Sequence, residues 1–270
     1  MFAQLTAPKL RLGARLIQAQ IVREVSELGA LGLLVAAAAL ASAQPLAAAP
    51  ADELQAAFHT AFPSPVRSVQ EPGNRGLPAR RVDLSLKPDV LVPVGAGRYG
   101  LVVLETDELG AHPDPGAVAV AYLRKTGSNW SLERVWPEFA WVGNTGHPAD
   151  GTQVLRFMPV PTVALSSQYV GQGQLSTTAW IVRLGARGPA LLGSVPLGGE
   201  LEPDNGCDSC QFYAYKARFA PAGHAGDVLS VAYAGRMLVG KRWTPFRQRT
   251  DYRESAGELK PTRALHLPTP

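Results

Sequence analysis

The sequence predicts an all-β domain of antiparallel sheets built from repeated hairpins, preceded by a signal segment and one short N-terminal helix. Three observations support this prediction: short apolar or alternating runs of strand length, turns rich in Gly, Pro and Asp between them, and a weak internal repeat. Alternation with a period of two places successive side chains on opposite faces of a sheet. No helical pattern separates the runs, which favours antiparallel hairpins over parallel strands joined by helices.

The first 43 residues have the pattern of a secretory signal peptide. Cationic residues precede an apolar core that begins near Leu28, and Ala41-Ser42-Ala43 supplies the small residues expected before a cleavage site. We therefore expect a mature chain that begins near Gln44 and is periplasmic or secreted. The alternative is an uncleaved anchor, because residues 28–51 carry no charge and are long enough to span a bilayer. We expect contact with a membrane only in that second case.

Residues 44–80 are expected to form a helix followed by a linker. Asp52–Phe62 carries apolar side chains at helical spacing, and Asp52 is a candidate N-cap. The segment from Pro63 to Pro78 is rich in proline and glycine, which indicates a loop rather than a regular element.

A single β-rich domain is expected at residues 81–255, with a flexible tail at residues 256–270. Ala121–Gly127 resembles Ala179–Gly185, and each segment leads through its glycine into a second strand that ends near a proline. Repeated hairpins of this kind build either a sandwich or a small propeller-like fold. The strand-like runs are residues 81–86, 99–105, 117–123, 177–182, 212–219 and 228–233.

The net charge of +4 does not by itself indicate a nucleic-acid partner. Half of this charge lies in the leader, and the rest of the chain has no basic cluster long enough to follow a phosphate backbone. We therefore expect no nucleic-acid partner. One basic aromatic stretch, Lys241–Arg249, is expected to be a final strand interrupted at Pro245 with its arginines facing water. Its alternative role is contact with an acidic partner through guanidinium and cation–π interactions.

Cys207 and Cys210 are the only cysteines of the chain. In an exported protein, we expect them to form a disulfide that closes a small turn. A thiol redox site is the alternative, but such a site typically places its reactive cysteine at a helix N-terminus, and no helical pattern follows here. A zinc site would need two further ligands, and His224 is the one histidine close in sequence. We expect no metal and no cofactor.

The segment that contains Trp136, Phe139, Trp141 and His147 is the candidate binding surface for a protein or carbohydrate ligand. Aromatic rings offer a large flat apolar area and lose little entropy when they are ordered. In the alternative interpretation, Trp130 and Trp136 face the core from one strand, because they lie an even number of residues apart, and Trp141 covers the edge.

The catalytic residues are unknown, and the one candidate set is a group of carboxylates, Glu105, Asp107 and Glu138. Paired carboxylates of suitable separation can act as acid and base in hydrolysis. The chain has no nucleophile elbow, zinc-protease motif, phosphate loop or dinucleotide fingerprint. The leading hypothesis is therefore an exported binding or interaction module. An envelope hydrolase that uses paired carboxylates comes second, and a Cys-x-x-Cys redox protein third.

Overall fold

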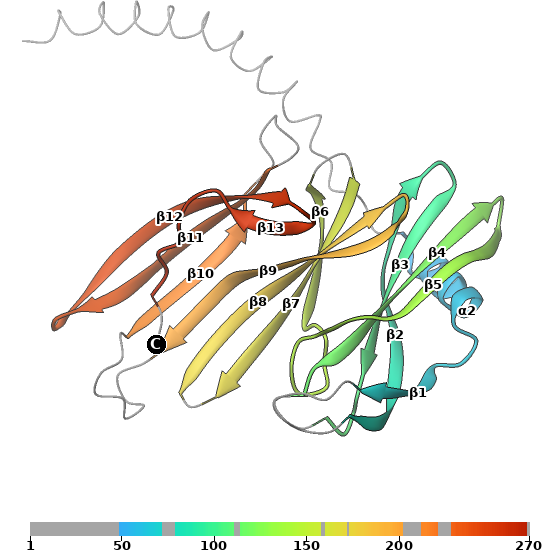
Figure 1. The fold of residues 1–270 in the computed structure, drawn as a ribbon, viewed down its shortest axis with the longest axis horizontal. Coiled ribbons are helices and arrows are strands. Elements are labelled where there is room, and N and C mark those ends of the chain that lie inside the picture. Colours follow the sequence, from blue (N-terminus) through green and yellow to red (C-terminus); the bar gives the residue numbers. More distant parts are fainter. Residues whose placement is uncertain are drawn as a thin grey trace, which may run out of the picture. The chain divides into compact units, whose positions relative to one another are not determined.

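The strands of the protein form two antiparallel sheets, and each strand pairs with its neighbours in sequence (Figure 1). The computed structural model describes residues 49–71, 79–110, 114–157, 160–171, 173–201, 212–220 and 228–268. The prediction of an all-β chain with antiparallel pairing and one short helix is confirmed. The predicted signal segment, residues 1–43, lies outside the described residues.

The helix and the strands of the first sheet come first along the chain. They are α2 (Ala51–Ala61), β1 (Val66–Glu71), β2 (Arg80–Gly95), β3 (Arg98–Thr106), β4 (Gly116–Thr126) and β5 (Asn129–Val142). The second sheet contains β6 (Gly151–Phe157), β7 (Val160–Gly171), β8 (Gln174–Gly185), β9 (Gly188–Leu201), β10 (Tyr213–Phe219), β11 (Val228–Val239), β12 (Arg242–Ser255) and β13 (Glu258–Pro261). Within the described ranges, no helix is both long enough and apolar enough to cross a bilayer.

Two boundary predictions at the start of the chain need correction. The helix begins at Ala51 with Pro50 at the N-cap position, so Asp52 lies in the first turn and does not cap it. The segment expected to be a loop contains β1, which pairs with β2 from Val66 to Glu71. An edge strand of this kind tolerates nearby prolines because only one of its sides needs ladder hydrogen bonds.

The C-terminal boundary also differs from the expectation. Within the segment expected to be a flexible tail, Glu258–Pro261 forms β13 and pairs with β12. Leu265 and Leu267 then pack against the core of the second sheet. The apolar side chains after β13 therefore continue the fold, because they bury surface that would otherwise face water.

The helix covers one face of the first sheet. Phe58 of α2 and Phe62, which follows the helix, pack in a cluster that includes Leu84 of β2 and Leu101 of β3. Strand β4, which lies between β3 and β5, is buried on both faces. Its alanines at 117, 119 and 121 belong to the helix side, while Val118, Val120 and Tyr122 belong to the other side. A strand that is buried on both faces reads as a continuous apolar run, as this one does in the sequence.

The second face of the first sheet packs against β7 and β8 of the second sheet. Hydrogen bonds reinforce this contact, because the Tyr122 hydroxyl donates to the Gly185 carbonyl at 2.7 Å and Arg98 donates to the Ala186 carbonyl at 2.7 Å. The Trp136 ring completes the contact, with its centroid 5.0 Å from that of Tyr122 in an edge-to-face arrangement. The turn of the β8–β9 hairpin is thereby fixed against β3 and β4.

The second sheet curls so that strands distant in its order meet. Arg183 of β8 donates a hydrogen bond of 2.6 Å to Glu254 of β12, although three strands lie between them in the ladder. The face inside this curl carries Ile181, Tyr233 and Tyr252, and we call it the Tyr233 face. The opposite face carries Val163 of β7, and we call it the Val163 face.

The contact between the two sheets leads to a stability prediction for the Tyr122 hydroxyl. The variant Tyr122→Phe removes one buried hydrogen bond to a backbone carbonyl and leaves the ring packing in place. We expect a loss of about 0.5–1.5 kcal/mol in the free energy of unfolding, measured by denaturant titration.

Tyr99→Phe is the matched control for this variant. The Tyr99 ring packs edge-to-face on Trp130 at 5.1 Å, on the helix side of the first sheet. Removing the Tyr99 hydroxyl should lower the free energy of unfolding by much less than removing the Tyr122 hydroxyl does. Equal losses in the two variants would contradict the role assigned to the Tyr122 hydroxyl.

Candidate functional site

The Val163 face of the second sheet is covered over one half and exposed over the other. At β7 and β8 it packs against the first sheet through Val163, Leu165 and Val182. At β10, β11 and β12 the same face carries Lys216, Arg218 and Arg247, all of which are exposed. Residues 213–255 hold eight Lys and Arg residues against three Asp and Glu residues. The exposed half of this face is therefore strongly basic.

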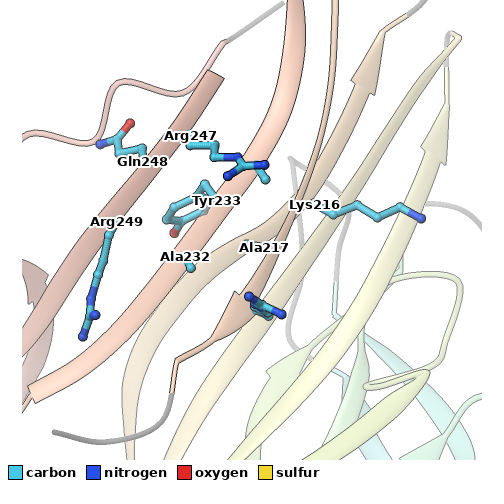
Figure 2. A pocket seen from close by; sticks show the side chains of 9 residues that line it. Lys216, Ala217, Ala232, Tyr233, Arg247, Gln248 and Arg249 are labelled. Carbon is cyan, nitrogen blue, oxygen red and sulfur yellow. The ribbon is translucent and has the colours of Figure 1, made fainter. Parts of the chain in front are cut away.

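A groove of about 700 Å³ lies on this exposed half, over the central strand β11. Its floor is formed by the small side chains of Ala232 and Ala234, whose neighbours across the ladder are cationic. Ala234 lies between Lys216 of β10 and Arg247 of β12, and Ala232 lies in the same way between Arg218 and Arg249. Figure 2 shows the lining side chains spread over these three strands. We call this site the cationic groove.

The spacing of the four cations follows from sheet geometry. Neighbouring strands lie about 4.8 Å apart, so the Cα atoms of the two walls are separated by about 10 Å across β11. Along each wall, the two cations are separated by two residues, or about 6.7 Å. The groove thus presents two parallel pairs of positive charges on either side of an apolar floor.

Among the described residues, most of these cations have no acidic partner. Arg249 is held by the Ser230 hydroxyl, to which it donates at 3.0 Å, and by Asp251, whose carboxylate lies 3.7 Å away. Within the described ranges, Lys216, Arg218 and Arg247 make no ion pair. Unpaired positive charges at such spacing attract anions, and the attraction weakens as salt screens it.

The predicted aromatic surface is not brought together as one exposed patch. Trp136 and Phe139 are half-buried and pack in the cluster between the two sheets. Trp141 is half-buried on the opposite side of the first sheet, where it packs with the cluster under α2. His147 is exposed in the turn that follows β5. These four residues therefore face different surroundings rather than a common ligand.

The expectation that Trp130 and Trp136 share one face is wrong. Trp130 packs in the cluster under α2, whereas Trp136 packs in the cluster between the sheets. The cause is a register shift between β4 and β5 at Tyr122 and Leu123, which inserts one extra residue into β5. A bulge of this kind reverses the alternation of every side chain beyond it.

The three candidate carboxylates belong to two separate arginine clusters. Glu105 and Glu138 share Arg67, which lies 3.5 Å from the Glu105 carboxylate and also contacts Glu138. Asp107 pairs with Arg80 at 3.0 Å. Arg80 also binds Glu71 at 2.5 Å and Asp114 at 2.7 Å.

Glu105 is buried, so its carboxylate is not accessible to a substrate at the surface. Its side chain has an exposed fraction of 0%. A groove of about 390 Å³ beside Arg80 is lined by Asp107 but by neither Glu105 nor Glu138. The three carboxylates therefore do not line one cleft in which a bond could be hydrolysed.

Glu105 is nevertheless an unusual group. Burial raises the pKa of its carboxyl, and the positive charge of Arg67 offsets only part of this effect. The backbone N–H of Glu138 donates to Glu105 at 3.3 Å, and Glu138 itself has a φ of 38°, in the left-handed region. That backbone conformation is rare outside glycine, and here the contacts with Glu105 and Arg67 hold it in place.

The remaining sequence predictions concern cysteine and metal chemistry. Cys207 and Cys210 lie outside the described residues, so the predicted disulfide stays a prediction. Among the residues that the structure describes, no group of three or more His, Cys, Asp or Glu side chains is placed to hold a metal ion.

Comparison with known proteins does not assign the chain to a family. No family model matches it, and neither a curated protein nor a solved structure matches it at a significant level. The site therefore has to be interpreted from its own geometry and charge.

The raised pKa of Glu105 predicts a dependence of stability on pH. Because the folded-state pKa lies above the unfolded value, the contribution of Glu105 to stability is present below about pH 4.5 and is lost as pH rises through the folded pKa, where the buried carboxyl must ionise. The variant Glu105→Gln cannot ionise, so it should lack this loss. Thermal unfolding of both proteins between pH 4 and pH 8 measures the difference.

Glu133→Gln provides the control of opposite sign. Although burial opposes the effect, hydrogen bonds from Arg124 and Arg98 lower the pKa of Glu133 below 4.5. Its contribution to stability is therefore present above the unfolded pKa and disappears as pH falls. Parallel pH profiles for the wild type and Glu105→Gln would show that Glu105 is not the buried titrating group.

Proposed function

We propose that this chain is an exported binding protein that takes a multivalent anionic ligand in the cationic groove. The observation that carries the proposal is the set of three exposed cations, Lys216, Arg218 and Arg247, arranged around an alanine floor without acidic partners among the described residues. Like charges held close together disfavour the folded state, so a protein that keeps such a cluster gains most when an anion neutralises it.

The form of the groove favours a ligand with several separated negative charges over a single small molecule. Small-molecule sites are typically concave and fix their ligand with a few precisely placed polar groups. Within the described part of the chain, Arg249 is the one wall cation of the cationic groove that a hydrogen bond orients, through Ser230. The other cations sit on long flexible side chains, which suit a repeated charge better than one fixed geometry.

The expectation against nucleic acid is retained in this proposal. Proteins that bind single strands combine a basic groove with exposed aromatic rings on which bases stack. Tyr233 is the aromatic residue that lines the groove, and its ring belongs to the buried cluster on the opposite face. Trp243 on β12 is exposed but does not line the groove, so the described lining offers no ring on which a base could stack. An exported location would also separate the protein from most nucleic acid.

Several finer features belong to the same proposal. The location, periplasmic or secreted, is supported by the apolar core and the small residues that precede Gln44. A Cys207–Cys210 disulfide is supported by that oxidising location and by the two-residue spacing. A sandwich-like packing of the two sheets, rather than a propeller, is supported by their shared core cluster.

The test is the binding of a soluble polyanion, dextran sulfate, to the full chain at low and at moderate salt. We expect binding that weakens steeply with salt, as charge-driven association does. The triple variant Lys216→Gln, Arg218→Gln and Arg247→Gln should bind at least tenfold more weakly and show a smaller salt dependence. Fluorescence anisotropy with labelled dextran sulfate measures both quantities.

The matched control removes the same number of exposed cations elsewhere. Arg81 and Lys87 lie on β2 and Arg263 follows β13, and all three are exposed. The triple glutamine variant at these positions has the same net charge as the groove variant. If the two triple variants lose affinity equally, only net charge matters and the groove is not the binding site.

A further inference from the structure

We propose that the anionic ligand of the cationic groove is the headgroup layer of a lipid bilayer, onto which the folded domain docks with the β11–β12 hairpin tip first. This inference rests on the proposed function and names its ligand. It differs from the sequence expectation, in which only an uncleaved leader would bring the chain to a membrane.

The first argument is the composition of the hairpin tip. β11 and β12 extend to a two-residue turn at Gly240 and Lys241, flanked by Val239 and Arg242. Val239 has an exposed fraction of 56%, and Trp243 has one of 37%. An exposed tryptophan and an exposed valine beside two cations form the combination that membrane interfaces favour, because the ring and the apolar chain enter the interface while the cations meet the headgroups.

The second argument is that the Trp243 side of the tip and the groove lie on one face, whereas Val239 lies on the other. Arg236 stacks on the Trp243 ring, with its guanidinium carbon 4.6 Å from the ring centroid. In the ladder, Arg236 and Arg247 lie on the same face as Ala234, the floor of the groove. Trp243 lies four residues before Arg247 on β12, a distance of about 13 Å along the strand.

The third argument is the shape of the surface. The groove lies on the outer face of a curled sheet, where an alanine floor on β11 runs between long cationic side chains of β10 and β12. A shallow basic surface can lie along a layer of negative headgroups, where each Lys or Arg contributes independently. A free polyanionic chain would use the same cations but would gain nothing from the exposed tryptophan and valine.

The experiment measures co-sedimentation of the full chain with vesicles of zwitterionic phosphatidylcholine, with and without 30% anionic phosphatidylglycerol. Every variant carries the same residues 1–43, so any contribution of that segment is common to all. We expect stronger binding to the anionic vesicles. Removing Lys216 and Arg247 together should reduce this binding about 25-fold, because each basic residue near an anionic surface contributes about fivefold.

The decisive variant is Val239→Ser with Trp243→Ser. It should weaken binding to the anionic vesicles at least fivefold and leave binding to dextran sulfate unchanged, because it removes apolar groups and keeps every cation. Leu109→Ser is its control, since Leu109 has an exposed fraction of 89% and lies in the turn that follows β3. This control should bind vesicles as the wild type does.

Three other outcomes would overturn part or all of this account. Binding to dextran sulfate without binding to anionic vesicles would overturn the lipid inference and leave the proposed function standing. Vesicle binding that the double serine variant does not change would show that the hairpin tip takes no part. Binding to neither probe would overturn both the lipid inference and the proposed function.

Discussion

The feature on which the rest of the structure depends is the contact between the first sheet and one half of the Val163 face. Valines and leucines of β7 and β8 are buried there against β4, and the Tyr122 hydroxyl ties β4 to the β8–β9 turn. Because the first sheet has five strands and the second has eight, and because the second sheet curls, no element among the described residues covers β10–β12 on this face. An uncovered sheet face can carry charged side chains at little cost, and here it carries the exposed cations Lys216, Arg218 and Arg247.

Much of the fold could be predicted from the sequence. Antiparallel hairpins, the repeat that became the β4–β5 and β8–β9 hairpins, and the N-terminal helix all follow from local patterns of alternation and turns. The faces of the strands were harder to assign, since a single extra residue reverses the alternation. The opposite placement of Trp130 and Trp136 is the clearest case, because the shift near Tyr122 is set by pairing with β4 and leaves no mark in the alternation of β5.

The candidate site was less predictable for a related reason. The sequence does contain one signal of the site, because its cations come in pairs spaced by two residues: Lys216 with Arg218, and Arg247 with Arg249. This spacing places both members of a pair on one face of a strand. The two pairs line one groove only because of the register in which β10 and β12 pair with β11. That register brings together residues that are far apart in sequence. The carboxylates show the converse case: Glu105 and Asp107 are neighbours in sequence, yet separate arginines, Arg67 and Arg80, hold them.

The central claim is that ligands bind on the exposed half of the Val163 face and not at the aromatic segment of β5. Hydrogen–deuterium exchange of the full chain, with and without anionic vesicles, tests it most directly. We expect added protection of backbone amides within residues 213–219 and 236–249, and unchanged exchange within residues 129–147. Protection confined to the segment from Trp136 to His147, with no change in β10–β12, would contradict the account and return the binding surface to the position that the sequence first indicated.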